Sequence, residues 1–218
     1  MKTPWSANVR DRTLVVTLPA LYRILSWAPL GGGLVEARTI MNHQVNTKEY
    51  ETSEPVVFLR ELARQLQLDT PVVGLMTGVL MERLVRQTVQ RNDVAIECFA
   101  TVGLSNVLTV GDPATYEEHP GTINIIAVVN QSLSNGALVE AVQIVTEARV
   151  HALSSAGVKS VVSERLATGT GTDCIAIACP IGGSAYRYCG KHTSLGELFG
   201  RVANEVIAEG LKRASYPA

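Results

Sequence analysis

The chain has 218 residues, of which 46% are hydrophobic, 18% charged and 5% aromatic, a composition typical of a domain with a large aliphatic core. Its 19 basic and 20 acidic side chains give a net charge of −1, so no basic stripe is available to bind nucleic acid. The sequence shows no apolar run of about eighteen residues and no apolar signal core, so we expect neither a membrane span nor secretion. We therefore expect one cytoplasmic domain over residues 1–218.

The first half of the chain predicts strands and one helix. Alternating apolar residues indicate strands, turn residues indicate hairpins, and a 3.6-residue period indicates a helix. The expected elements are a hairpin of strands at 13–19 and 22–29, a strand at 33–45, a helix at 54–68, a strand at 71–79 and a hairpin at 83–90 and 94–103.

The second half predicts two longer helices among further strands. We expect a strand at 121–130, a helix at 137–157 whose polar side chains face solvent, and a strand at 173–180. The last helix is expected to begin at Ser194, where Ser194-x-x-Glu197 fits a capping box. Together these elements predict an α+β layered domain with mixed, largely hairpin-built sheets and about three long helices.

Two segments of similar sequence each contain a loop of small residues. "ATVGLSNVLTVGDP" (Ala100–Pro113) and "ATGTGTDCIAIACP" (Ala167–Pro180) align without a gap. One interpretation is an internal duplication whose glycine loops let backbone N–H groups approach a ligand, and the alternative is ordinary tight turns. We predict that the first loop (Thr101–Asn106) and the second loop (Thr168–Asp173) meet in space and form one wall of a substrate pocket.

The four cysteines lack the spacing of a metal site or of a disulfide framework. Cys98, Cys174 and Cys179 lie in apolar runs and are expected to be buried, reduced thiols. Cys189 differs, because the neighbouring Lys191 and His192 favour a lowered thiol pKa. We nevertheless predict that Cys189 is dispensable for chemistry.

Six short motifs occur in a fixed order between Thr39 and Gly200. They are "TIMNHQV", "ATVGLSN", "GTINIIAVVN", "GALVEAVQIVTEA", "ATGTGTD" and "GKHTSLGEL". In combination they resemble the adenosylcobinamide amidohydrolases, the CbiZ family. The resemblance implies hydrolysis of the amide between the corrin ring and its aminopropanol arm, giving adenosylcobyric acid and 1-amino-2-propanol in corrinoid salvage. It implies a corrinoid substrate that brings its own cobalt, with no other cofactor or metal, and leaves a homo-oligomer open.

Amide hydrolysis needs a base or nucleophile, a donor to the leaving nitrogen and donors to the oxyanion. Asp173 is the candidate base, because it ends the second loop before an apolar strand; its alternative role is to cap the turn. Lys191 and His192 are candidate donors to the leaving amine or the oxyanion, with a solvated turn as the alternative. We expect them within reach of the opening formed by the two loops, because only residues 181–190 connect them to the strand after Asp173. The candidate substrate-binding residues are Ser105, Asn106, Thr168, Thr170, Thr172, Asn42 and His43. The alternative for His43 is a packed, hydrogen-bonded histidine.

Other functional classes stay open at this point. A non-catalytic module that binds a corrinoid or a nucleotide would use the same glycine loops without chemistry. An amide hydrolase with a threonine nucleophile freed by self-cleavage within "ATGTGTD" is a further alternative. The sequence has no HExxH and no G-x-S-x-G motif, so it indicates neither a zinc hydrolase nor a nucleophile-elbow serine hydrolase.

Overall fold

The computed structural model describes residues 3–46, 54–114 and 121–215. In chain order its elements are β1 (Ser6–Arg10), β2 (Thr13–Ser26), β3 (Gly33–Gln44), α2 (Pro55–Gln65), β4 (Val72–Thr77), the 3₁₀ turn η1 (Met81–Arg83), β5 (Val85–Arg91), β6 (Val94–Val102), β7 (Val107–Leu108), β8 (Ile123–Val129), α3 (Asn135–Ser155), β9 (Gly169–Thr170), β10 (Cys174–Pro180) and α4 (Ser194–Ser215). The predicted α+β class is confirmed, with three α-helices in the part described. None of them is long and apolar enough to cross a membrane.

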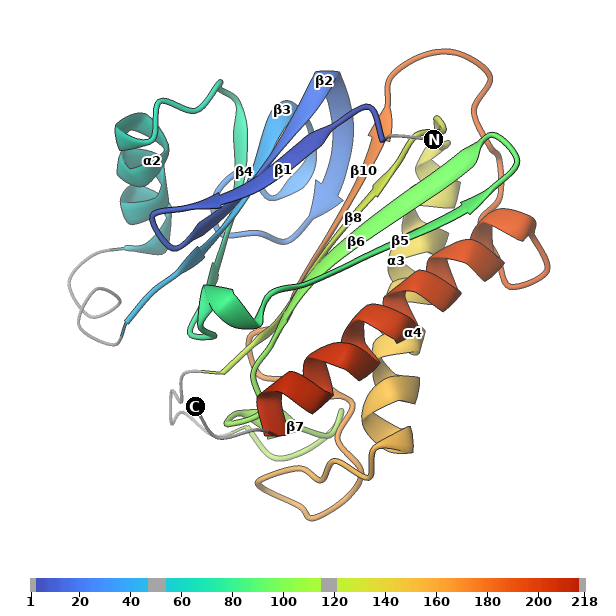
Figure 1. Cartoon of the computed structure of the whole chain (residues 1–218). Helices are drawn as coiled ribbons and strands as arrows, with labels where there is room; N and C mark the ends of the chain where they lie inside the picture. Colours follow the sequence, from blue (N-terminus) through green and yellow to red (C-terminus); the bar gives the residue numbers. More distant parts are fainter. Residues whose placement is uncertain (1–2, 47–53, 115–120, 216–218) are drawn as a thin grey trace.

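One mixed sheet carries most of the strands. Its order is β4-β3-β2-β10-β8-β6-β5, with β1 paired to β2. The β3–β4 and β8–β10 pairs are parallel and the other pairs are antiparallel. Although three strands separate β4 from β8 in this order, the two are in contact, so the sheet folds over itself into two layers. Figure 1 shows β1 to β4 as one layer and β5, β6, β8 and β10 as the other.

Apolar side chains fill the spaces between these layers. One cluster lies between the two strand layers and includes Ile40, Phe99 and Ile126. A second packs α3 and α4 against β5, β6, β8 and β10, and a third packs α2 against β3 and β4. All nine residues of β6 are buried, because both faces of this strand are covered. The order of layers is therefore helix, sheet, sheet, helices, which leaves the strand ends as the places where polar groups gather.

The predicted first hairpin is wrong, since β2 is a single strand from Thr13 to Ser26. Its pairing with β3 shifts between Thr17 and Tyr22, where four residues of β2 (18–21) lie opposite one residue of β3, Arg38. Pro19 lies within this irregularity. Proline cannot donate to a strand ladder and is tolerated at bulges, so the segment that suggested a turn is a bulge inside a long bent strand.

The helix α4 begins at Ser194 as predicted, but it is capped one residue earlier than expected. Thr193, and not Ser194, caps the helix, since its hydroxyl oxygen accepts a hydrogen bond from the Gly196 amide at 2.9 Å. Glu197 does not close a capping box, because its carboxylate binds the Arg91 guanidinium at 2.5 and 2.6 Å. The predicted box is therefore wrong, and the contact instead joins α4 to the β5–β6 hairpin.

Candidate active site

Four buried polar side chains from four different strands meet at one end of the two strand layers. Asn42 of β3, Thr77 of β4, Thr101 of β6 and Asn124 of β8 are each no more than 2% exposed. Asn124 Nδ2 donates to Asn42 Oδ1 at 3.0 Å, Asn42 Nδ2 donates to Thr101 Oγ1 at 3.1 Å, and Thr101 Oγ1 donates to Thr77 Oγ1 at 3.3 Å. We refer to these four residues as the strand-end network.

The alternation of side chains along each strand places the network between the layers. Asn42 shares a strand face with Ile40, Thr101 with Phe99, and Asn124 with Ile126, and these apolar partners all belong to the cluster between the layers. Each strand thus changes from apolar to polar as it reaches this end. Buried amides and hydroxyls are costly without hydrogen-bond partners, so their mutual bonds fix the four side chains in place.

The strand-end network is also hydrogen-bonded to nearby backbone groups. The second amide hydrogen of Asn124 is donated to the carbonyl oxygen of Met76, at 2.6 Å. The Val79 amide donates to Thr77 Oγ1 at 3.1 Å. The bonds to these side chains within the described residues involve no carboxylate and no imidazole. The network therefore supplies amide and hydroxyl groups, which suit a carboxamide substrate or an oxyanion, but no base.

The first and second loops lie against each other, as predicted. Val107 and Leu108 of β7 pair with β9, and the Gly171 amide donates to the Asn106 carbonyl at 3.2 Å. Thr168 Oγ1 accepts from the Val110 amide at 2.8 Å. The two loops thus form a small two-stranded unit beside the strand-end network.

The glycines allow close approach between these loops. A Cβ added at Gly171 would lie 2.9 Å from Asn106 Nδ2, and one added at Gly121 would lie 2.3 Å from Ser105 Oγ. A Cβ at Gly169 would lie 2.2 Å from a carboxylate oxygen of Asp173. A side chain at any of these positions would force its neighbour to move, so these glycines serve the packing of protein against protein.

The structure does not support an internal duplication of the two aligned segments. Ala100–Val102 ends the long strand β6, whereas Ala167 lies ahead of the two-residue strand β9. Further along, the alignment matches the two-residue β7 to β10, a seven-residue strand inside the main sheet. The sequence similarity therefore reflects a shared need for small residues at one contact.

Asp173 accepts four hydrogen bonds on its two carboxylate oxygens. Oδ1 accepts from the Ile123 amide at 3.0 Å and from Thr170 Oγ1 at 2.5 Å, and Oδ2 accepts from the Thr170 amide at 2.8 Å. Arg149 Nη1 lies 2.7 Å from Oδ2, and the side chains of Arg149 and Asp173 are 11% and 8% exposed. Asp173 thus ties the second loop to β8 and to α3.

The second loop also contacts the start of β8 through Thr172. The Thr172 carbonyl accepts from Thr122 Oγ1 at 2.7 Å, and Thr172 Oγ1 donates to the Gly121 carbonyl at 3.3 Å. Thr122 and Ile123 directly precede Asn124. The second loop therefore borders the strand-end network through this short stretch of backbone.

His43 points away from the network. It neighbours Asn42 on β3, so its side chain projects from the opposite face of the strand, toward α2. There it is 3% exposed, its Nδ1 lies 2.7 Å from Thr13 Oγ1, and its ring centroid lies 5.6 Å from that of Phe58. The structure thus brings Asn42, but not His43, to the strand-end network.

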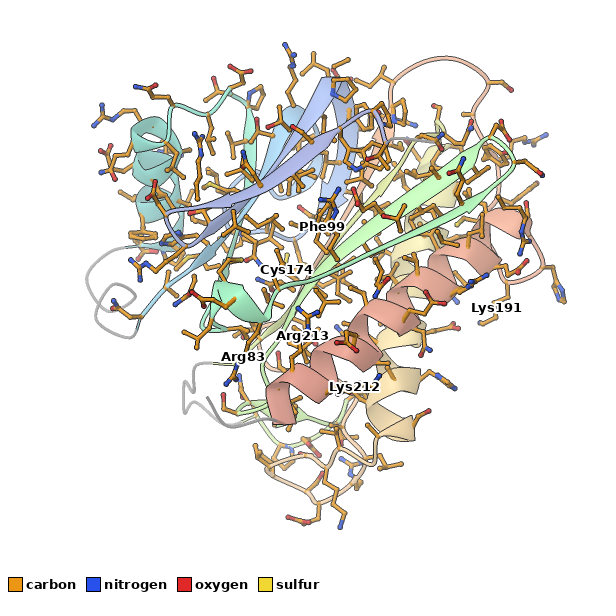
Figure 2. The ribbon with its side chains drawn as sticks, in the orientation of Figure 1. Arg83, Phe99, Cys174, Lys191, Lys212 and Arg213 are labelled. Atoms are coloured by element: carbon orange, nitrogen blue, oxygen red, sulfur yellow. The ribbon has the colours of Figure 1, made fainter. Side chains whose placement is uncertain are left out.

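Lys191 and His192 do not lie near the two loops. Lys191 lies just before the first turn of α4, and its Nζ binds the Glu147 carboxylate of α3 at 2.5 Å. The last turns of α4 are the ones close to the first loop, since Gly210 packs on Val102. Figure 2 shows Lys191 at one end of α4 and Arg213 at the other, and the 22 residues of this helix span about 30 Å.

The prediction that Lys191 and His192 share an opening with the loops is therefore wrong. The physical reason is the direction of β10, which carries the chain from Asp173 to Pro180 at the far end of the sheet. The following segment then runs along α3, where the Cys189 amide donates to Glu140 at 2.5 Å. Because Glu140 and Glu147 bind this segment, the predicted solvent face of α3 is in part covered.

The other predicted binding residues gather around the two loops, with different exposure. Ser105 and Thr172 are exposed, and Asn106, Thr168 and Thr170 are partly buried. Sequence reasoning did not select Thr77, Asn124 or Arg149. The available signal was a polar residue inside an apolar strand, as in "GTINIIAVVN", where Asn124 interrupts a β-branched run.

All four cysteines are free and buried. Burial, with a smaller contribution from the Glu140 carboxylate, raises the pKa of Cys189 to about 12, and burial raises the pKa of Cys174 to about 12. The predicted lowering of the Cys189 pKa is therefore wrong. The Lys191 ammonium that was expected to lower it binds Glu147 instead.

We expect the folded protein to resist thiol alkylation. A pKa near 12 leaves a thiolate fraction at pH 8 about three orders of magnitude below that of an ordinary cysteine. Iodoacetamide at pH 8 should therefore leave the intact mass unchanged in buffer and add four carbamidomethyl groups in urea. Rapid labelling of Cys189 in the folded protein, with loss of activity, would contradict this expectation.

In the described part of the chain, no three His, Cys, Asp or Glu side chains are grouped to hold a metal ion. What the fold gathers at the loop end of the sheet is a set of amides and hydroxyls backed by a buried ion pair. These groups define a layered α+β protein with a candidate site of amide and hydroxyl groups.

Comparison with known proteins gives the family. The family model for adenosylcobinamide amidohydrolase, CbiZ, matches residues 3–216. The chain belongs to this family, and it is a hydrolase of the amidase type. The adenosylcobinamide amidohydrolase of Methanosarcina mazei is 30% identical over 214 residues, which cover 94% of each chain. An uncharacterised protein of Methanocaldococcus jannaschii is 26% identical, over 92% of this chain and 86% of its own.

Solved structures show more distant similarity. The PH0078 protein of Pyrococcus horikoshii is 10% identical with a TM-score of 0.47, over 95% of this chain and 79% of its own. The L-aminopeptidase D-Ala-esterase/amidase of Ochrobactrum anthropi is 8% identical with a TM-score of 0.43, over 97% and 82%. Similarity at this level carries no argument about the chemistry of this chain.

Proposed function

We propose that this protein hydrolyses adenosylcobinamide to adenosylcobyric acid and 1-amino-2-propanol, in the cytoplasm, as a step of corrinoid salvage. The observation that carries the proposal is the family match over residues 3–216, joined to a strand-end network of amides and hydroxyls. A corrinoid is edged with carboxamides. Such a substrate needs many donors and acceptors spread over a broad surface, which the two loops offer, with the buried network beside them.

The proposed roles follow from the donors available. Asn42 is the proposed amide donor to the scissile carbonyl or its oxyanion, because one of its two amide hydrogens binds Thr101 and the other is left for a substrate. Both amide hydrogens of Asn124 bind within the protein, so Asn124 is proposed to hold Asn42 in place. The exposed Ser105 and Thr172, with Asn106, are proposed to bind carboxamides at the rim of the ring. Asp173 enters the proposal as the anchor of the second loop, since its carboxylate oxygens accept four hydrogen bonds.

The test is a product assay with the purified full chain. Incubation with adenosylcobinamide is expected to release 1-amino-2-propanol in proportion to the adenosylcobyric acid formed, both measured by mass spectrometry. A shift of the corrinoid absorption spectrum on mixing would report binding separately. Binding without release of 1-amino-2-propanol would contradict the proposed hydrolysis and favour a corrinoid-binding module.

A further inference from the structure

We infer that Arg149 of α3 is a positioning residue for this reaction, acting through Asp173 to hold the second loop against the start of β8. The inference rests on the proposed function for the reaction concerned. Arg149 is 9% exposed, although it lies on a long surface helix. A buried arginine needs partners for its donors, and the partners of Arg149 lie at the two ends of one loop.

The Arg149 guanidinium bridges the second loop. Its Nη1 lies 2.7 Å from the carboxylate of Asp173, which ends the loop, and its Nε donates to the carbonyl of Thr168, which begins it, at 3.2 Å. The planar fork of arginine suits such a two-point contact better than the single ammonium of lysine. The loop is thus held at both ends by one side chain from another layer of the protein.

Gly169 makes room for this ion pair. A Cβ at position 169 would lie 2.2 Å from Asp173 Oδ2 and 3.1 Å from the Arg149 guanidinium carbon. The pair therefore packs directly on the backbone of Gly169. This contact gives a second way to disturb the ion pair, by a methyl group at position 169 that leaves both charges in place.

The contact is transmitted to the proposed site through backbone. Asp173 Oδ1 accepts from the Ile123 amide, and the next residue is Asn124, whose side chain bonds to Asn42. Movement of the second loop would therefore shift Asn124, and with it the proposed amide donor Asn42, relative to the scissile bond. A misplacement of about 1 Å at a reacting group can reduce a rate about 10²-fold.

Trp27 offers a readout of loop position that does not depend on activity. Its indole N–H donates to the Asp173 carbonyl at 2.5 Å, and the residue is 49% exposed. The second tryptophan of the chain, Trp5, is 4% exposed. Acrylamide quenching of fluorescence in the native protein therefore reports mainly on Trp27 and on the loop it contacts.

The experiment compares Arg149→Ala, Arg149→Lys and Gly169→Ala with Arg165→Ala as the matched control. Arg165 also pairs with a buried aspartate, Asp112, at 2.6 Å, and its Nε donates to Ser163 Oγ, which lies outside the second loop. For Arg149→Ala we expect kcat/KM for adenosylcobinamide to fall about 10²-fold, mostly in kcat, and acrylamide quenching to rise. Guanidinium ion at concentrations well below unfolding should restore part of the activity of Arg149→Ala and of no other variant.

The conservative variants keep the test decisive if Arg149→Ala does not fold. Arg149→Lys retains the charge and should lie between wild type and Arg149→Ala, while Gly169→Ala should lower kcat and raise quenching with Arg149 still present. Unchanged kcat and quenching in both Arg149→Lys and Gly169→Ala would overturn the inference, as would an equal loss of kcat in Arg165→Ala. If the wild type releases no 1-amino-2-propanol, the proposed function fails, and the quenching series still shows whether Arg149 holds the loop.

Discussion

Asparagine in place of Asp173 is expected to lower the free energy of unfolding by about 3 to 5 kcal/mol, which is the usual cost of removing one partner of a buried ion pair. The substitution leaves the Arg149 guanidinium, 11% exposed at its side chain, without its counter-charge. It also turns one oxygen into an NH₂ group that faces donors, because Thr170 and Ile123 both donate to this carboxylate. Urea unfolding of Asp173→Asn and wild type measures the difference.

The matched control for this prediction is Glu147→Gln. It breaks an ion pair of similar length, 2.5 Å to Lys191, in which both side chains are exposed, so stability should change little. If Asp173→Asn instead kept the stability of the wild type while losing turnover, the anchor role would be refuted and a general-base role for Asp173 would be favoured. The stability measurement thus separates the two roles that the sequence left open for this residue.

Most of the fold could be predicted because its signals are local. The alternation in β6 and the helical period in α3 are properties of short windows, and both elements lie where they were expected. The error in β2 has the same origin. Pro19 and its neighbours resemble a turn in isolation, and only the pairing of β2 with both β3 and β10 shows that the strand continues.

The candidate site could be predicted only in part, because it depends on the direction of strands. The contact between the two loops was predicted from their similar sequences, although the structure explains that similarity by packing and not by duplication. The expectation that Lys191 reaches the loops considered only the short segment after β10, yet β10 itself carries the chain from Asp173 to the far end of the sheet. Arg149 has no distinguishing signal in its helix, since only the fold brings it to the second loop.

Removal of the Asn124 amide is expected to have the largest effect on turnover. Asn124→Ala deletes the donor to Asn42 Oδ1 and to the Met76 carbonyl, and with it the order of the strand-end network. Asn42, the proposed oxyanion donor, is then no longer held in place. Loss of one oxyanion donor typically reduces kcat about 10²- to 10³-fold, and we expect a fall in this range for release of 1-amino-2-propanol. Rates of product formation at saturating adenosylcobinamide measure it, with circular dichroism to confirm the fold.

Asn130→Ala is the matched control for Asn124→Ala. Asn130 follows the opposite end of β8, where its side chain accepts from the Ala95 amide at 2.8 Å and donates to the Asp93 carbonyl at 2.7 Å. Both variants thus lose an asparagine that bonds to neighbouring backbone. Asn124 lies beside the two loops, whereas Asn130 lies at the other end of β8. We expect kcat of Asn130→Ala to stay close to that of the wild type. If Asn124→Ala also kept kcat within about tenfold of the wild type, Asn124 would not hold an oxyanion donor in place, because the displacement of a donor that acts in the transition state costs more than that in rate.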